Sequence, residues 1–169
     1  MRRLIGLQRT SAARAACAAA LCCLVACLVA PFAGAAPSTF GPVIGNALLC
    51  RSHLDNAYFY SYMASAFGPS YKHEGGAFWF KADATLWGAP VSDILVSDDT
   101  SEWVFVGAVS DSKPDQLDEA IRAAVGVRHL VQDKTPFPVR ASAPGSQIVY
   151  FNDKSKIYCA RYKPLAPAP

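Results

Sequence analysis

The stretch AFWFKADATLW (77–87) alternates between two kinds of side chain, and this alternation limits the folds that the chain can adopt. In an extended strand, successive side chains point to opposite faces. One face receives an apolar set, which comprises Phe78, Phe80, Ala82, Ala84 and Leu86. The other face receives a mixed set, which comprises Trp79, Lys81, Asp83, Thr85 and Trp87. This pattern predicts an antiparallel sheet with one face on a core and the other face in water.

The flanking sequence adds helices and further strands. A helix is predicted over 53–67, between Ser52, which begins a sequence resembling a capping box, and the helix-ending pair Gly68-Pro69. A second helix is predicted between Ser112 and Gly126, because apolar residues recur there at helical spacing. Further strands are predicted at 91–97, 102–109, 127–132, 146–151 and 156–162.

This order of elements predicts an α+β fold. We expect a single domain with an antiparallel sheet of about five to six strands and two helices packed on one face. No strand leads through a glycine-rich loop into a helix, so the sequence gives no support for a nucleotide-binding fold. The predicted limits are an extended lead-in at 37–46, a compact domain at 47–163 and a Pro-rich tail at 164–169.

Residues 1–36 are predicted to be a secretory signal peptide. Four arginines and no acidic residue precede an apolar run over 15–30, and Ala33-Gly34-Ala35 supplies a small-residue cleavage pattern. We therefore expect an exported protein, either periplasmic or secreted.

Two alternatives for this leader stay open. The first is an uncleaved membrane anchor, for which the apolar run is short, because a span needs about 20 residues. The second is a lipoprotein, because LVAC at 24–27 resembles a lipobox with Cys27 as the lipidated residue. We expect a membrane association only if Cys27 is lipidated.

Loss of the leader changes the charge of the chain. The whole chain has 16 basic and 13 acidic residues, and four of the basic residues lie in the leader, so the remaining net charge is −1. A nearly neutral chain with interspersed charges lacks the basic surface that nucleic-acid binding requires. We expect no nucleic-acid partner.

Only Cys50 and Cys159 of the six cysteines lie outside the leader. In an oxidising compartment they are predicted to form a disulfide that joins the start of the first helix to the last strand. A zinc site is one alternative, because His53 lies three residues after Cys50, but it would need further ligands such as His73 or His129. A catalytic thiol is another, and it would require a free thiolate beside a base.

The sequence HEGG at 73–76 is the most reactive-looking motif of the chain. His73 and Glu74 are adjacent, however, and adjacent side chains of a strand point to opposite faces. The motifs of serine hydrolases and zinc proteases are absent, and spacing ties no serine to a histidine and an acid. We therefore assign no catalytic residue, metal ligand or cofactor. A small hydrolase-like enzyme that uses His53 or His73 with nearby acids is the alternative.

Aromatic residues supply the candidate interaction surface. Tyr58 and Tyr62 share a face of the first helix, whereas Trp79 and Trp87 share the outer face of their strand, with Trp103 on a neighbouring strand. Exposed rings of this kind are typical of partner-binding surfaces. If a loop or helix covers that face, the rings form a second core instead.

The sequence thus favours an exported, disulfide-clasped binding module without enzymatic activity. An inhibitor, an adaptor and an envelope assembly factor all fit this description. The expected partner is a protein or a glycan of the cell envelope.

Overall fold

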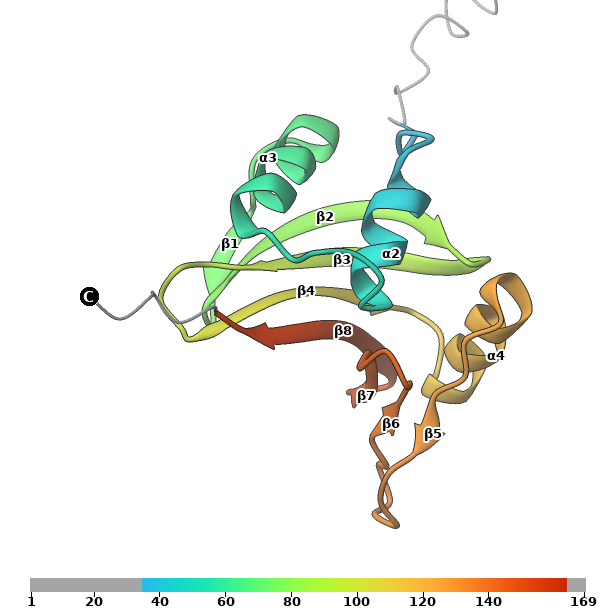
Figure 1. The fold of residues 1–169 in the computed structure, drawn as a ribbon. Helices are drawn as coiled ribbons and strands as arrows, with labels where there is room; N and C mark the ends of the chain where they lie inside the picture. Colours follow the sequence, from blue (N-terminus) through green and yellow to red (C-terminus); the bar gives the residue numbers. More distant parts are fainter. Residues whose placement is uncertain (1–34, 164–169) are drawn as a thin grey trace, which may run out of the picture. The chain divides into compact units, whose positions relative to one another are not determined.

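Eight antiparallel strands form one sheet in residues 35–163, the part of the chain that the computed structural model describes (Figure 1). The strands are β1 (Lys72–Glu74), β2 (Ala77–Leu86), β3 (Ala89–Ser97), β4 (Trp103–Ser110), β5 (Leu130–Val131), β6 (Arg140–Ala141), β7 (Gln147–Phe151) and β8 (Lys154–Tyr162). Their order across the sheet is β1-β2-β3-β4-β8-β7-β6-β5. The predicted signal peptide up to residue 34, Cys27 and the predicted tail lie outside the described residues.

Helices cover one face of this sheet, and Figure 1 shows α2 and α3 above β2, β3 and β4. The helical segments are the π-helical turn η1 (Gly41–Gly45), α2 (Asn46–Leu48), α3 (Asn56–Phe67) and α4 (Pro114–Val125). Buried side chains from each of them join one core cluster with the sheet. Within residues 35–163, no helix is long and apolar enough to cross a membrane.

The predicted α+β class is confirmed, but the predicted numbers of elements are wrong. The described residues form eight strands instead of five to six, and three α-helices instead of two. Strands β1 and β6 were missed because they have three and two residues, too few for an alternation to be visible. Helix α2 was missed because it lies in and beside the segment that was predicted to be extended.

The core face of the sheet is built from residues that pair across the strands. Phe80 pairs with Ile94, Ile94 with Ala108, Ala108 with Ile157, and Ile157 with Ile148. All five are at most 1% exposed. Residues paired in this way have side chains on the same face, so this row forms the centre of the layer beneath the helices.

The neighbouring row points to the opposite, open face. Trp79 pairs with Leu95, Leu95 with Gly107, Gly107 with Tyr158, and Tyr158 with Gln147. A second, smaller apolar cluster forms there, and Trp79, Phe105 and Phe151 pack against it. The predicted division of strand 77–87 into an apolar and a mixed face is therefore confirmed at its centre.

Trp87 does not lie on the outer face with Trp79, and this part of the interpretation is wrong. Trp87 and Gly88 form the two-residue turn between β2 and β3, with φ angles of 55° and 84°. The turn brings the indole to η1, where a Cβ on Gly45 would lie 3.5 Å from the ring. Trp87 therefore packs against the core on the helical side.

The prediction of an extended lead-in at 37–46 is also wrong. This segment contains η1 and the first residue of α2, so much of it is helical. Phe40, Ile44, Ala47 and Leu48 are at most 2% exposed. Their spacing of four, three and one residues places them on one face of a helix, and that face packs on the sheet.

The predicted disulfide between Cys50 and Cys159 is confirmed. Cys50 follows α2, and Cys159 lies in β8 opposite Val106 of β4. The Cα atoms of the two cysteines are 5.3 Å apart, and Cys159 is fully buried. The bond therefore attaches the N-terminal helical segment to the centre of the sheet.

Candidate functional site

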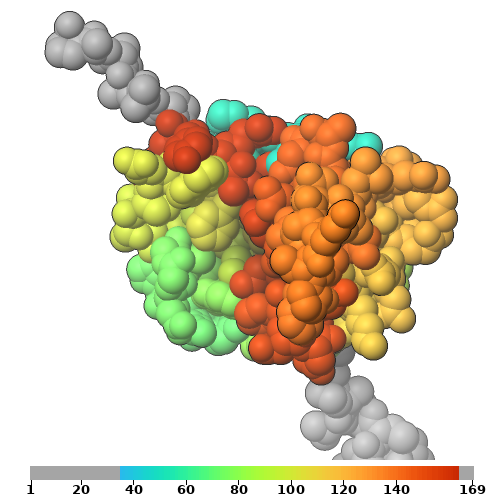
Figure 2. Space-filling view, turned by 90° about the horizontal axis from the view of Figure 1, so that it is seen from below, coloured from blue at the N-terminus to red at the C-terminus, as the bar shows by residue number. Residues whose placement is uncertain are grey.

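A groove of about 510 Å³ lies on the open face of the sheet. Its lining comes from five strands and the two turns at their ends, and comprises Glu74, Gly75, Ala77, Trp79, Leu95, Ser101, Trp103, Phe105, Gly107, Lys156, Tyr158 and Ala160. Figure 2 shows this side of the molecule, where the surface is hollowed between the residues of β1–β4 and those of β5–β7.

The groove exists because small residues alternate with large rings along β4 and β8. Gly107 lies opposite both Leu95 and Tyr158 and contributes no side chain, which leaves space at the centre of the row. A Cβ on Gly107 would meet its neighbours at 3.6 Å, an ordinary van der Waals distance. A Cβ could therefore be accommodated at this position, where Gly107 lines the groove.

Aromatic rings surround this space. Trp103 is 40% exposed at one end of the groove, and its ring centroid lies 3.9 Å from that of Tyr162. The Trp79 indole N–H donates to the carbonyl oxygen of Glu74 at 3.2 Å, which fixes the ring near the β1–β2 turn. The Tyr158 hydroxyl lies 2.6 Å from Gln147 Oε1 and donates to it, so its ring is also held in place.

Two lysines lie beside these rings. Lys72 Nζ is 5.0 Å from the ring centroid of Trp79 and is paired with Glu74. Lys156 Nζ is 4.2 Å from the ring centroid of Phe151 and 5.2 Å from that of Trp79. Burial lowers the pKa of Lys156, and the positive charge of Lys72 lowers it further. Within residues 35–163, no carboxylate forms an ion pair with Lys156.

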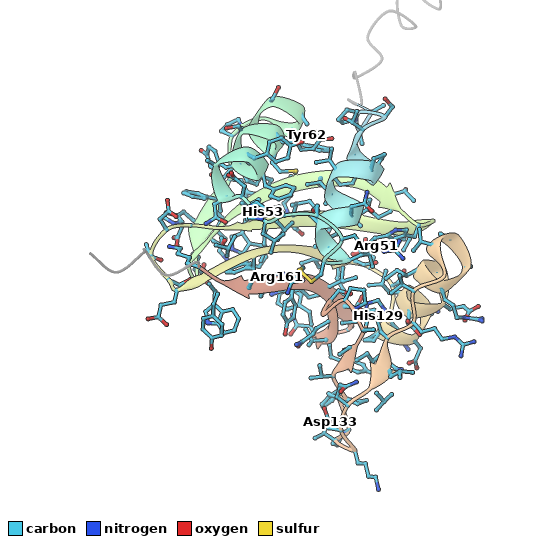
Figure 3. All side chains as sticks on the ribbon, viewed as in Figure 1. Arg51, His53, Tyr62, His129, Asp133 and Arg161 are labelled. Carbon is cyan, nitrogen blue, oxygen red and sulfur yellow. A yellow bond between two sulfur atoms is a disulfide. The ribbon has the colours of Figure 1, made fainter. Side chains whose placement is uncertain are left out.

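The four residues predicted as one interaction surface lie in three places. Tyr58 and Tyr62 are on α3, with ring centroids 6.5 Å apart and the Tyr62 hydroxyl 3.1 Å from Thr39 Oγ1. Figure 3 places Tyr62 on the helical side of the sheet, together with His53. Trp87 packs below η1, and Trp79 alone lines the groove.

Most groove residues were not assigned from the sequence. Phe105, Tyr158 and Lys156 belong to strands that were predicted, but their common face depends on the pairing of β4 with β8. The alternation of large and small residues in β4 was a usable signal, because Trp103, Phe105 and Gly107 occupy every second position.

A second cavity, of about 470 Å³, lies between α3 and the β3–β4 turn. His73 Nε2 is 2.6 Å from Asp98 Oδ2 at this cavity, and the imidazole stacks on Phe78 with ring centroids 4.3 Å apart. Thr100 binds the other carboxylate oxygen of Asp98 through its hydroxyl and through its backbone N–H, at 2.5 and 2.9 Å. These hydrogen bonds lower the pKa of Asp98 to about 2, and the bond from the Thr100 hydroxyl has the largest effect.

This geometry predicts a dependence of stability on pH. A carboxyl whose pKa is about 2 in the folded protein and 3.8 in the unfolded chain stabilises the fold above pH 4 and loses this effect as the pH falls towards 2. Asp98→Asn should therefore lower the free energy of unfolding at pH 6 and leave it nearly unchanged at pH 2. Urea titrations at both values measure this, with Asp99→Asn as the matched control because that side chain is 91% exposed. Equal losses at both pH values would contradict the prediction.

A third cluster has a buried histidine and serine and a partly exposed acid. His129 Nδ1 lies 3.1 Å from Asp118 Oδ1, and His129 Nε2 lies 2.7 Å from Ser146 Oγ. The Ser142 hydroxyl is 2.8 Å from Ser146 Oγ, and His129 and Ser146 are 2% and 0% exposed. The sequence did not predict this cluster, because its serine, histidine and acid are far apart in the chain and come together only in the fold. Figure 3 shows His129 near α4, from which Asp118 projects.

The remaining sequence hypotheses find little support in the geometry. His53 is exposed beside a small cavity with Arg51 and Tyr58, away from His73. Cys50 is bonded to Cys159 and is neither a free thiol nor a zinc ligand. Residues 35–163 contain no group of three or more histidine, cysteine or acidic side chains placed to hold a metal ion.

Comparison with family models, curated proteins and solved structures gives no match for this chain.

Proposed function

We propose that this chain is an exported, disulfide-clasped binding module that holds an apolar segment of another polypeptide in the groove on its open sheet face. The observation that carries the proposal is the groove itself, an uncovered space of about 510 Å³ lined mainly by aromatic and small side chains. Rings that are fixed before binding lose little entropy on contact, and such anchors dominate the energy of protein interfaces. Export is supported by the leader sequence.

A polypeptide fits the lining better than a glycan does. A sugar presents several hydroxyl groups, and each buried hydroxyl needs a hydrogen-bond partner. The groove offers few polar side chains, and two of these are occupied, because Tyr158 binds Gln147 and Glu74 binds Lys72 at 2.7 Å. An apolar side chain of a partner protein would fill the space without leaving polar groups unpaired.

A hydrolase-like activity at His73 is the second candidate, and the His73–Asp98 contact at the edge of a cavity favours it. A carboxylate with a pKa of about 2 stays ionised and orients the imidazole. Within residues 35–163, however, no serine or cysteine side chain forms a hydrogen bond with His73, so the site lacks an activated nucleophile. The same contact attaches the edge strand β1 to the β3–β4 turn, which is a sufficient structural role.

Photo-crosslinking in cells that make the protein tests the binding proposal. Benzoylphenylalanine is placed at Ser101, on the rim of the groove, and in the control at Glu119, whose side chain is 62% exposed on α4. We expect protein adducts from Ser101, and their loss when Gly107→Leu fills the groove. A Cβ at this position makes only ordinary contacts, at 3.6 Å, and circular dichroism checks that the variant folds.

Once the crosslinked partner is identified, Trp79→Ala should weaken its binding by about thirtyfold, as expected for a central aromatic anchor. Tyr58→Ala on α3 is the matched control and should have little effect. Adducts that survive Gly107→Leu would contradict the proposal. If no protein adduct forms but a purified envelope glycan binds in a Gly107-dependent manner, the glycan alternative is correct.

A further inference from the structure

The groove contains a positive charge that the rest of the described chain does not neutralise. Lys156 Nζ lies over the rings of Phe151 and Trp79, at 4.2 and 5.2 Å from their centroids. Ring faces attract a cation but accept no conventional hydrogen bond, so the ammonium donors stay available for a stronger acceptor. The Lys156 ammonium can therefore donate hydrogen bonds to an anion in the groove.

The neighbouring acids are already engaged by other cations. Glu74 Oε2 lies 2.7 Å from Lys72 Nζ, and Asp93 Oδ1 lies 2.8 Å from Lys81 Nζ. Asp93 also accepts from the hydroxyl of Tyr71, at 2.8 Å. Each of these carboxylates would have to break an existing contact in order to reach Lys156.

The position of Lys156 in the sheet places its charge at one end of the apolar groove. Lys156 precedes Tyr158 by two residues on β8, and both side chains therefore point to the open face. Lys156 pairs with Val109, whereas Tyr158 pairs with Gly107, so the ammonium lies one row away from the open space above Gly107. Gly107 and Lys156 both line the groove, so a ligand that fills this space can also contact Lys156.

We infer that the partner segment carries a carboxylate beside its apolar anchor, and that Lys156 binds this carboxylate. The inference rests on the proposed function, because it specifies the chemistry of the segment held in the groove. Burial and the charge of Lys72 lower the pKa of Lys156, and a bound carboxylate would offset both effects. The expected segment is therefore acidic as well as apolar, for example a phenylalanine or leucine next to a glutamate or aspartate.

Two fluorescent probes with the same ring system distinguish the contribution of the Lys156 charge to binding from that of apolar contact in the groove. Anilinonaphthalene sulfonate carries an anion, which stands in for the carboxylate, and phenylnaphthylamine lacks it. Lys156→Met keeps much of the apolar stem and removes the charge, and we expect it to weaken sulfonate binding by at least about tenfold. Binding of the neutral probe should stay within about twofold, because it depends on apolar contact alone. Lys156→Arg should retain the preference for the anion.

Gly107→Leu distinguishes failure of this inference from failure of the proposed function. If Gly107→Leu leaves the binding of both probes unchanged, the groove is not the site and both proposals are wrong. If Gly107→Leu weakens both probes but Lys156→Met affects them equally or not at all, only the role of Lys156 is wrong. Lys156→Gln replaces Lys156→Met if the latter does not fold, as judged by circular dichroism.

Competition then tests the chemical source of the anion. A blocked peptide of sequence Gly-Phe-Glu-Phe-Gly should displace the sulfonate probe more effectively than its counterpart with glutamine in place of glutamate. In Lys156→Met this difference between the two peptides should disappear. Displacement by dodecanoate but by neither peptide would assign the groove to an amphiphilic lipid and overturn the choice of a polypeptide.

Discussion

Removal of the disulfide by the double substitution Cys50→Ala and Cys159→Ala is expected to lower the free energy of unfolding by about 4–5 kcal/mol. The two cysteines are 109 residues apart in the sequence, so the bond restricts nearly the whole unfolded domain. In the chain-entropy model, such a long closed loop gives a stabilisation near the upper end of the usual range. A domain of this size is stable by about 5–15 kcal/mol, so the loss would be a large fraction of the total.

Urea unfolding at pH 7, followed by tryptophan fluorescence, measures this effect. The matched control is reduction, since dithiothreitol should shift the unfolding midpoint of the wild-type protein and leave that of the double variant unchanged. Alanine is preferred to serine because Cys159 is fully buried and a hydroxyl there would lack a partner. A loss below about 1 kcal/mol would show that the native contacts of the N-terminal helical segment, rather than the bond, hold it to the sheet.

The disulfide could be predicted because the cysteines allowed only one pairing. The central part of the sheet could be predicted because the alternation of side chains is visible within a single strand. Only two cysteines lie outside the predicted leader, so there was one possible pair. In β2, the alternation of Trp79 and Phe80 assigns one side chain to each face, and the structure shows Phe80 buried and Trp79 on the open face. A period of two needs no knowledge of the partner strands.

The position of Trp87 could not be predicted by extending this alternation. The strand ends at Leu86, and the φ angle of 55° at Trp87 turns its ring to the opposite face. Large residues rarely adopt such angles, so nothing in the local sequence indicated the change. The helical segment around Ile44 was missed for a different reason. Its apolar residues do have helical spacing, but the nearby prolines and glycines are typical of loops and led to the prediction of an extended segment.

The groove required information about register that a single sequence does not contain. Gly107 opens a space only because Leu95 and Tyr158 lie beside it, on strands that are distant in sequence. A shift of β8 by one residue would move Tyr158 and Lys156 to the core face. The same limitation applies to the contact between His129 and Ser146, which joins two loops.

The cluster of Asp118, His129 and Ser146 leads to the second large prediction, because its contacts resemble those of a catalytic triad. The acid faces Nδ1 of the imidazole and the serine faces Nε2, as in serine hydrolases. A catalytic serine must meet its substrate, however, and Ser146 is 0% exposed. Ser146 Oγ is also within hydrogen-bond distance of Ser142 Oγ. We therefore expect a structural role.

His129→Leu should accordingly lower the free energy of unfolding by about 3 kcal/mol, because it removes the imidazole that contacts Asp118 and Ser146 and leaves Ser142 as the side-chain partner of Ser146. The backbone N–H of His129 still donates to Asp118 Oδ1 at 2.7 Å, which limits the loss. Urea unfolding at pH 7 measures the change. The matched control is His53→Leu at an exposed position, which should alter stability by no more than about 0.5 kcal/mol.

The pH dependence and a serine-directed reagent separate the structural role of His129 from a catalytic one. Burial lowers the pKa of His129 below its ordinary value of 6.5, so the folded protein holds the neutral imidazole. As the pH falls below 6.5, the unfolded chain binds a proton at this histidine more readily than the folded chain does, so the wild-type protein should lose stability. His129→Leu should remove this part of the pH dependence, whereas His53→Leu should retain it. A fluorophosphonate reacts with activated serines, and it should not label Ser146 in the folded protein because the native hydroxyl is enclosed. Rapid labelling of Ser146 in the folded protein would show that the cluster opens and acts as a nucleophilic site.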